Sequence, residues 1–292
     1  TRSSNFNTPY MIQFDRPGEL HTFLREKKQL GASVGFIPTM GALHEGHLSM
    51  VRRSVTENDL TVVSIFVNPI QFNNPADLEK YPRNLERDIS QLDCARCDIL
   101  FTPGVADMYP PGEVLQEIDL NGLDRVMEGK FRPGHFRGVA IVVRKLFETV
   151  EPHVAYFGKK DFQQLVIIRH MVKSLDLPVR IIPIETARES DGLAMSSRNL
   201  RLTPEDRALA PKIHEVLQWT RSQAGNIPPR ELERLALARL KAVRGLDPEY
   251  FEIVNAVTLL PVTDWQQNAP AVACTAVNIN NIRLIDNLEV FC

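Results

Sequence analysis

Short apolar runs alternate with amphipathic segments in the part of the chain that ends at Ile184. The run Thr61–Val67 is almost continuously apolar, which is typical of a strand buried on both faces of a parallel sheet. The segment Phe136–Val150 instead carries apolar residues at helical spacing. This alternation predicts an α/β fold with a doubly wound, Rossmann-like parallel sheet. The predicted strands are 34–37, 61–67, 99–102, 154–157 and 179–184, and the predicted helices are 18–30, 47–58, 85–92, 136–150 and 163–175.

The pattern changes after Ile184. A polar loop, Glu185–Asn199, leads into two helix-like segments, 204–223 and 229–243, and Pro211 is expected to kink or split the first. Three strand candidates follow without helices between them, which favours an antiparallel sheet. They are 251–257, 271–279 and 282–285. We therefore expect a Rossmann-like domain of residues 1–184 and a smaller α+β domain of residues 185–292.

The composition is that of an ordinary globular protein. Of the 292 residues, 43% are hydrophobic and 24% are charged. A net charge of −2 gives no basic surface for nucleic acid or an anionic membrane, so an anionic ligand must be held by local groups. The longest apolar runs are too short to span a bilayer, and residues 1–10 lack the apolar core of a signal peptide. These features predict a cytoplasmic protein without a nucleic-acid or membrane partner.

The four cysteines do not form a metal-binding pattern. Cys94 and Cys97 make one C-x-x-C pair, but no second pair or nearby histidine completes a zinc site. Cys274 and Cys292 are isolated in the sequence. We therefore expect ordinary reduced thiols.

The stretch Val34–Leu48, VGFIPTMGALHEGHL, is the first candidate for chemistry. It is typical of a strand that Pro38 and Gly41 end, followed by a glycine turn and a helix. Such a turn directs backbone N–H groups and the positive end of the helix dipole beyond the strand, where phosphate commonly binds. The spacing of His44 and His47 does not fit a zinc protease, and Gly41 and Gly46 do not fit the dinucleotide fingerprint. The alternative is that the histidines only cap the helix.

Other segments also suit an anionic or polar ligand. Gly158–Asp161 is a second glycine turn between strand and helix, and the loop Asp191–Asn199 offers two serines and an arginine. Gln71 follows the strand Thr61–Val67, at the edge where open α/β sheets bind ligands. The segment 128–135, EGKFRPGH, is a candidate lid. Together, the histidine turn, the Gly158–Asp161 turn and the serine loop favour a nucleotide.

Six segments give a family resemblance. They are PTMGALHEGHL at 38–48, FVNPIQF at 66–72, RPGHFRGV at 132–139, FGKKDFQQ at 157–164, DGLAMSSRN at 191–199 and RLIDN at 283–287. In this order they resemble the pantoate–beta-alanine ligase (pantothenate synthetase) family, which belongs to the HxGH nucleotidyltransferases. The resemblance implies that the first domain binds nucleotide and pantoate and that the second closes over the ATP site.

The resemblance also implies an ATP-dependent ligation in two steps. The carboxylate of (R)-pantoate would attack the α-phosphorus of ATP, giving enzyme-bound pantoyl adenylate and pyrophosphate. The amine of beta-alanine would then displace AMP and form pantothenate. Free pantoyl adenylate would hydrolyse or lactonise, so the site has to exclude water between the steps. Mg²⁺ bound through the ATP phosphates, with no assigned protein ligand, and a homodimer are further implications.

The resemblance assigns roles to individual residues. His47 is the proton donor, and an imidazolium there would stabilise the charge that builds up on the α-phosphate. Lys160 would hold the departing pyrophosphate, Asp161 a ribose hydroxyl, and the backbone of Ala187 the adenine. The catalytic set is His44, His47, Lys160 and Arg198. The ATP-binding set is Met40, Gly41, Ala42, Leu43, His44, Glu45, Gly46, His47, Gly158, Lys159, Lys160, Asp161, Ala187, Met195, Ser196, Ser197 and Arg198.

Two glutamines and one arginine complete the implied site. Gln71 and Gln164 match the positions that the family uses for pantoate, and Gln71 also serves beta-alanine. A neutral amide orients a carboxylate without neutralising it, whereas a bidentate arginine would lower its nucleophilicity. The alternative for each glutamine is a solvated surface amide. Arg132, in the candidate lid, would meet phosphate in the closed state, and its alternative is a surface ion pair.

The chain departs from the family pattern at two places beside the implied chemistry. Arg201 stands where the family commonly has an aromatic residue, and Asn73–Ala76 replaces a more acidic sequence. Two other functions stay open at this point: a nucleotidyltransferase of the same superfamily that acts on a phosphate-bearing cofactor precursor, and a non-catalytic nucleotide-binding module. Pyrophosphate release that depends on pantoate would distinguish the ligase from both.

Overall fold

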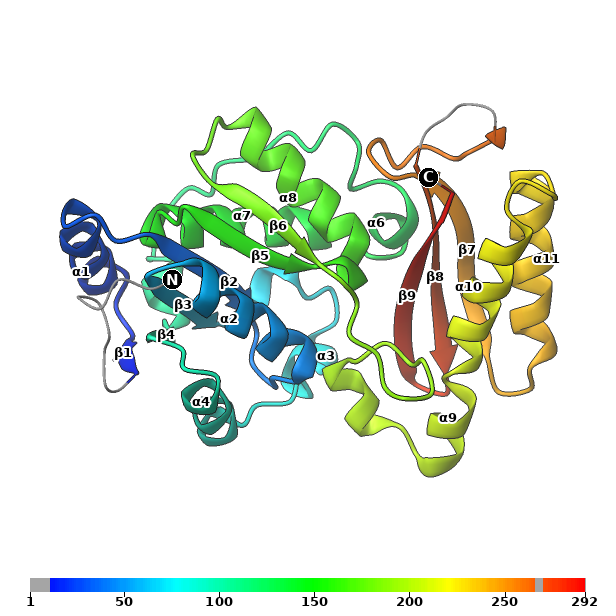
Figure 1. The fold of residues 1–292 in the computed structure, drawn as a ribbon, viewed down its shortest axis with the longest axis horizontal. Helices are drawn as coiled ribbons and strands as arrows, with labels where there is room; N and C mark the ends of the chain where they lie inside the picture. Colours follow the sequence, from blue (N-terminus) through cyan, green and yellow to red (C-terminus); the bar gives the residue numbers. More distant parts are fainter. Residues whose placement is uncertain (1–10, 266–269, 292) are drawn as a thin grey trace. The chain divides into compact units, whose positions relative to one another are not determined.

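The computed structural model describes residues 11–265 and 270–291 (Figure 1). The chain divides into two compact units. The N-terminal unit contains the chain up to Asp124 together with residues 132–159 and 167–185. The C-terminal unit contains Thr186 onward and two short earlier segments, 125–131 and 160–166. The expected polar tail 1–10 and Cys292 lie outside the described residues.

The N-terminal unit is built on a parallel sheet in the strand order β1-β4-β3-β2-β5-β6. Every neighbouring pair is parallel, which confirms the predicted Rossmann-like sheet. The strands are β1 (Ile12–Phe14), β2 (Val34–Thr39), β3 (Leu60–Ile65), β4 (Ile99–Phe101), β5 (Val154–Gly158) and β6 (Arg180–Ile184). The edge strand β1 was not predicted, because its three residues, IQF, include a polar one, unlike the equally short apolar strand β4.

Helices cover both faces of this sheet. Successive strand residues point to opposite sides, so neighbouring side chains pack against different helices. Ile37 faces the core beneath α2 and α4, whereas Phe36 faces α7 and meets the ring of Phe147 at a centroid distance of 6.2 Å. Both β2 side chains are fully buried, as in a sheet covered on two sides. The helices are α1 (Pro17–Gln29), α2 (Glu45–Glu57), α3 (Pro75–Glu79), α4 (Leu85–Cys94), α5 (Val105–Met108) and α7 (His135–Val150), with the 3-10 turn η2 (Pro69–Gln71).

Pro38 does not end strand β2, contrary to the sequence-based expectation. The strand continues to Thr39, and Pro38 is aligned with Ser64 of β3. On its other side β2 pairs with β5 only at Gly35 and Phe36. Pro38 thus lies beyond the β5 ladder, where its missing N–H leaves no sheet hydrogen bond unmade.

The C-terminal unit holds an antiparallel sheet of β7 (Asp247–Asn255), β8 (Ala271–Ile279) and β9 (Ile282–Phe291), as predicted. Its helices are α9 (Pro204–Leu209), α10 (Lys212–Gln223) and α11 (Pro229–Ala242), and its 3-10 turn is η4 (Ser197–Arg201). Helix α10 packs on β9 and α11 on β7 (Figure 1). The split of the first predicted helix at Pro211 is confirmed.

The segments 125–131 and 160–166 contribute α6 (Met127–Phe131) and the start of α8 (Phe162–Ser174), which follows the 3-10 turn η3 (Lys159–Asp161). None of the helices within the described ranges is long and apolar enough to cross a membrane. Cys94, Cys97 and Cys274 form no disulfide bond within the described residues, and the last two are buried.

Candidate functional site

The turn between β2 and α2 places the two histidines at a helix N-terminus. Gly41 and Ala42 both adopt positive φ angles, +79° and +50°, and the chain then enters α2 with His44 as its N-cap. The Nδ1 atom of His44 accepts a hydrogen bond of 3.2 Å from the backbone N–H of Gly46. The Nδ1 atom of His47 accepts one of 3.3 Å from the backbone N–H of His44. The two imidazole rings lie with their centroids 4.0 Å apart.

This capping pattern assigns the tautomer of both histidines. A ring nitrogen that accepts a hydrogen bond carries no proton, so each imidazole is neutral with its hydrogen on Nε2. The histidines therefore do cap the helix, and the capping atoms are their two Nδ1 atoms. Their Nε2–H groups are hydrogen-bond donors, and the first-turn N–H groups of α2 supply the partial positive charge that favours an anion.

Asp88 holds the backbone of this turn by hydrogen bonds, a role that the sequence did not predict. Its carboxylate accepts hydrogen bonds from the backbone N–H of Ala42 at 2.9 Å and of Leu43 at 2.8 Å. The side chain comes from the first turn of α4 and is 2% exposed. A buried carboxylate that accepts two backbone N–H groups holds them in one orientation. Asp88 therefore positions the residues that lead into the histidine turn.

Gln71 lies in η2, just past the end of β3, and is 7% exposed. Its Nε2 contacts the sulfur of Met40 at 3.1 Å. Gln71, which is predicted to bind pantoate, therefore lies beside the first residue of the histidine turn. The surface-amide alternative is wrong for Gln71, since its side chain is buried and hydrogen-bonded. No hydrogen bond decides between the two interpretations for Gln164, which lies in the C-terminal unit and is partly exposed.

Arg132, from the candidate lid, is joined to the backbone beside Gln71. Its guanidinium donates to Nε2 of His135 at 3.1 Å, so the Nδ1–H of His135 donates to the carbonyl of Gln71 at 2.8 Å. His135 is 7% exposed. A buried imidazole is therefore one partner of this arginine.

The first half of the candidate lid belongs to the C-terminal unit. Glu128, in α6, accepts two hydrogen bonds from Arg283, at 2.6 and 2.8 Å, and one from the hydroxyl of Tyr250 at 2.9 Å. The ring of Phe131 stacks on Tyr250 with a centroid distance of 5.6 Å. These contacts tie residues 128–131 to β7 and β9.

Several predicted ATP-binding residues of the C-terminal unit are held by backbone contacts. The backbone N–H of Met195 donates to the carbonyl of Ala187 at 2.9 Å. This bond joins Ala187, predicted to contact adenine, to the serine loop. The side chain of Ser196 caps η4 by accepting from the backbone N–H of Arg198 at 3.2 Å. The amide of Asn287 donates to the carbonyl of Lys160 at 2.8 Å. The GKKD turn and the RLIDN segment are thus in direct contact.

Arg188 and Asp286, which adjoin these segments in the sequence, form a largely buried ion pair. The guanidinium donates to both carboxylate oxygens, at 2.7 and 2.9 Å, and also to the carbonyls of Gly192 and Asn287, at 3.0 and 3.2 Å. His214 packs beside the pair with its Nδ1 3.8 Å from Asp286. Burial, and then the charge of Arg188, lower the pKa of His214, and Asp286 opposes this shift. Sequence reasoning assigned none of these three residues a role.

The predicted site residues are thus distributed over both units. The N-terminal unit carries Met40–His47, Gln71, Arg132, Gly158 and Lys159. The C-terminal unit carries Lys160, Asp161, Gln164, Ala187 and Met195–Arg198. Lys159 pairs with Glu185 at 2.6 Å, and the Nζ of Lys160 lies 3.5 Å from Asp161.

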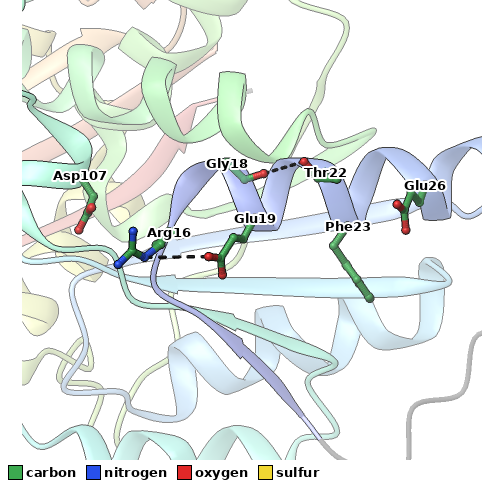
Figure 2. Close-up of a pocket in the computed structure, with 7 residues that line it drawn as sticks. All are labelled: Arg16, Gly18, Glu19, Thr22, Phe23, Glu26 and Asp107. Carbon is green, nitrogen blue, oxygen red and sulfur yellow. Dashed lines mark hydrogen bonds and ion pairs between the residues drawn. The ribbon is translucent and has the colours of Figure 1, made fainter.

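A surface recess of the N-terminal unit is not part of this set. It lies along α1 and encloses about 720 Å³ (Figure 2). Arg16, Glu19, Phe23 and Asp107 are among its lining residues, and none of the predicted site residues lines it. The described residues also contain no cluster of three or more His, Cys, Asp or Glu side chains arranged to hold a metal ion.

Comparison with known proteins gives a consistent picture. The family model for pantoate-beta-alanine ligase matches residues 13–289. A curated pantothenate synthetase from Bacteroides fragilis is 48% identical over 271 residues, which cover 93% of this chain and 96% of the relative. The crystal structure of pantothenate synthetase from Thermus thermophilus is 44% identical, covers 97% of this chain and 100% of its own, and superposes with a TM-score of 0.89.

A further solved structure contains ligands. It is the pantoate-beta-alanine ligase from Francisella tularensis complexed with beta-gamma ATP and beta-alanine. That protein is 37% identical to this chain, with a TM-score of 0.78 and coverage of 96% of this chain and 97% of its own. Each match extends over both units of the fold.

Proposed function

The chain belongs to the pantoate–beta-alanine ligase family, and from this membership we propose how its residues carry out the ligation. The enzyme condenses pantoate with beta-alanine to form pantothenate and uses ATP as co-substrate. The single observation that carries the residue assignment is the pair of capping histidines. Their Nδ1 atoms accept backbone hydrogen bonds, so Nε2–H is the donor of each ring, at a helix N-terminus suited to phosphate. The family match sets aside the nucleotidyltransferase and binding-module alternatives.

The reaction proceeds in two steps in this proposal. A carboxylate oxygen of pantoate attacks the α-phosphorus of ATP, and the bond to the bridging oxygen breaks so that pyrophosphate leaves. The amine of beta-alanine then attacks the acyl carbon of pantoyl adenylate, loses a proton and expels AMP. The first step is needed because the oxygen of a free carboxylate is a poor leaving group, whereas AMP is a good one.

In the N-terminal unit, Met40–His47 binds the ATP phosphates. His47 donates its Nε2–H to an oxygen of the α-phosphate and stabilises the charge of the five-coordinate transition state. In this proposal the donor is a neutral imidazole, because its Nδ1 accepts a backbone hydrogen bond; from the sequence we expected an imidazolium. His44 offers the same kind of donor beside it. Gln71 orients the carboxylate of pantoate, and it serves beta-alanine in the second step.

In the C-terminal unit, Lys160 takes the pyrophosphate and Asp161 a ribose hydroxyl. Gly158 and Lys159, which precede them in the sequence, belong to the N-terminal unit. Ala187 meets adenine through its backbone, and Met195–Arg198 binds the triphosphate. The backbone contacts of Lys160 and Ala187 and the side-chain contact of Ser196 support these roles because they hold the segments in fixed conformations. Gln164 is the second amide for pantoate. That the C-terminal domain closes over ATP, and that Arg132 then meets phosphate, stay predictions.

We also propose that Mg²⁺ enters with the triphosphate. Mg²⁺ keeps several waters and binds substrate phosphates with few protein ligands, so we assign it no protein ligand. The metal would neutralise phosphate charge. The homodimer that the resemblance implies stays a proposal for solution measurements.

The two steps can be separated by withholding beta-alanine. Enzyme mixed with ATP, Mg²⁺ and (R)-pantoate should release a burst of about one pyrophosphate per active site, because the adenylate stays bound. Adding beta-alanine should then produce AMP and pantothenate together. Omitting pantoate, or supplying (S)-pantoate, is the control and should give no burst. Pyrophosphate that appears only after beta-alanine is added would rule out the adenylate.

A further inference from the structure

A chain of amide hydrogen bonds lies behind Gln71. The hydroxyl of Tyr109 bonds to Oδ1 of Asn68 at 2.8 Å. The Nδ2 of Asn68 bonds to Oε1 of Gln71 at 3.1 Å and to the carbonyl of Gly138 at 3.1 Å. The Nε2 of Gln71 then reaches the sulfur of Met40 at 3.1 Å. All of these residues belong to the N-terminal unit, and Asn68 is 1% exposed.

The carbonyl of Gly138 determines which atoms donate and which accept in this series of hydrogen bonds. A carbonyl can only accept, so the atom of Asn68 that faces it must be the NH₂ group. The second hydrogen of that group then meets Gln71, which must present its oxygen, and Asn68 Oδ1 must accept from Tyr109. The orientation of both amides therefore follows from hydrogen-bond chemistry and needs no assumption about which atom is nitrogen.

Glycine at position 138 allows this close approach. A Cβ atom there would lie 2.7 Å from the carbonyl oxygen of Ile70 and 2.8 Å from Cα of Gln71, so helix α7 can lie directly against η2 only without a side chain. The Gly138 carbonyl is thereby brought to the buried amide of Asn68. The backbone of η2 and the amide of Asn68 share one rigid support.

Tyr109 is held at the other end of the chain. Its ring contacts Phe66 at a centroid distance of 6.2 Å, and the ammonium of Lys145 lies 5.7 Å from the ring centre. Lys145 is in turn paired with Glu113 at 2.5 Å. Burial, and then the charge of Glu113, raise the pKa of Tyr109, so its hydroxyl keeps the proton that it donates.

We propose that Tyr109 is a positioning residue that acts through Asn68 to set the amide of Gln71, so that Gln71 presents an N–H donor to pantoate. The inference rests on the proposed function, since it takes Gln71 as a pantoate ligand. One hydrogen of Nε2 is directed at Met40 sulfur, a weak acceptor, and the second has no partner in the described part of the chain. The group of pantoate that meets Gln71 is therefore an acceptor, a carboxylate oxygen or a hydroxyl oxygen.

Tyr109→Phe tests the proposal with little change of shape. Removing the hydroxyl leaves the buried oxygen of Asn68 without its donor, and the Asn68 and Gln71 amides lose their fixed orientation. We expect KM for pantoate to rise about 3- to 10-fold, while KM for ATP changes less than about twofold. Tyr156→Phe is the matched control, because it also removes a hydrogen-bonded tyrosine hydroxyl from the same unit, one that contacts Asn58 and Glu57. It should leave both KM values unchanged.

A double-mutant cycle tests the route through Asn68. If Tyr109 acts only through that amide, Tyr109→Phe should change the pantoate KM by less than about twofold in an Asn68→Ala background. Effects that multiply in the double variant would overturn the proposal. So would a Tyr109→Phe enzyme that raises both KM values together or that matches Tyr156→Phe.

Measurements on the wild-type enzyme distinguish a failure of the positioning role from a failure of the proposed function. If wild type shows no pantoate-dependent pyrophosphate release, the proposed function fails and Tyr109 is not at issue. If wild type turns over normally and Tyr109→Phe keeps the wild-type pantoate KM, the positioning role alone is wrong.

Discussion

The backbone N–H of Leu43 donates a hydrogen bond of 2.8 Å to the carboxylate of Asp88, a residue 45 positions further along the chain. Ala42 donates to the other carboxylate oxygen at 2.9 Å. One buried side chain from α4 therefore fixes two consecutive peptide groups at the entrance to the histidine turn. The geometry of the proposed phosphate site depends on this support as well as on the histidines.

Asp88→Asn should weaken ATP binding. An amide can accept from one backbone N–H, but its own NH₂ group then faces the other, so one buried donor is left unpaired at a cost of about 1–3 kcal/mol. We expect KM for ATP to rise about 10-fold and the thermal stability to fall. Glu86→Gln is the control, since it removes an exposed carboxylate from the same helical turn. Equal ATP KM values for Asp88→Asn and wild type would contradict the bracing role.

His47→Asn separates the two functions of His47. The Oδ1 of asparagine can replace Nδ1 as acceptor for the backbone N–H of His44, but nothing replaces the Nε2–H donor. We expect the melting temperature to stay near that of wild type, while the rate of pantoate-dependent pyrophosphate release falls about 10²- to 10³-fold. His47→Ala should lose both the rate and the cap. Rapid-quench measurement of a single turnover gives the rate, and a His47→Asn enzyme with the wild-type rate would rule out the donor role.

The sequence pattern predicted the architecture where periodicity was long and regular. Buried parallel strands such as β3 and amphipathic helices such as α7 were found with small errors at their ends. The strand ending at Pro38 was predicted wrongly because the effect of a proline depends on which neighbour needs its N–H, and that neighbour is set by sheet register. Strand β1 is stabilised by pairing with β4, which no local pattern records.

In the candidate site, too, local features were predicted from the sequence and long-range contacts were not. Contiguous motifs such as the histidine turn and the serine loop can be read from neighbouring residues. The residues that support them cannot, because Asp88 and Asn287 act on backbone groups 45 and 127 positions away. Arg188 and Asp286 are 98 positions apart. Only the RLIDN match indicated that residues 283–287 mattered, and it carried no role.

Arg188→Met should destabilise the C-terminal unit. The substitution leaves Asp286 without its charge partner, and the two side chains are only 18% and 5% exposed, so the loss should be about 3–5 kcal/mol. Arg207→Met is the control, because its pair with Asp191 is 34% and 41% exposed and should contribute about 0–1 kcal/mol. The two tryptophans of the sequence, Trp219 and Trp265, both lie in this unit. Their fluorescence during urea unfolding measures the difference, and equal losses for the two variants would contradict the argument.

The stability of the C-terminal unit should also depend on the protonation of His214. Burial, followed by the charge of Arg188, lowers the pKa of this imidazole below its ordinary value of 6.5. The unfolded chain therefore binds a proton more readily than the folded unit, and stability rises with pH where only the unfolded chain is protonated. The contribution is fully present above about pH 6.5 and is lost as pH falls below it.

His214→Gln should flatten this dependence. His214 is the only histidine of the sequence after residue 185, so the difference between variant and wild type isolates its titration. Burial raises the pKa of Glu252, whose contribution is present below the ordinary carboxyl range and lost as pH rises through its folded pKa, so it works in the opposite sense in both proteins. Urea unfolding followed by tryptophan fluorescence at a series of pH values between about 5 and 8 measures the two slopes. Since a neutral glutamine takes up no proton, wild type should lose more stability than the variant on acidification, and parallel slopes would show that His214 does not titrate as its burial requires.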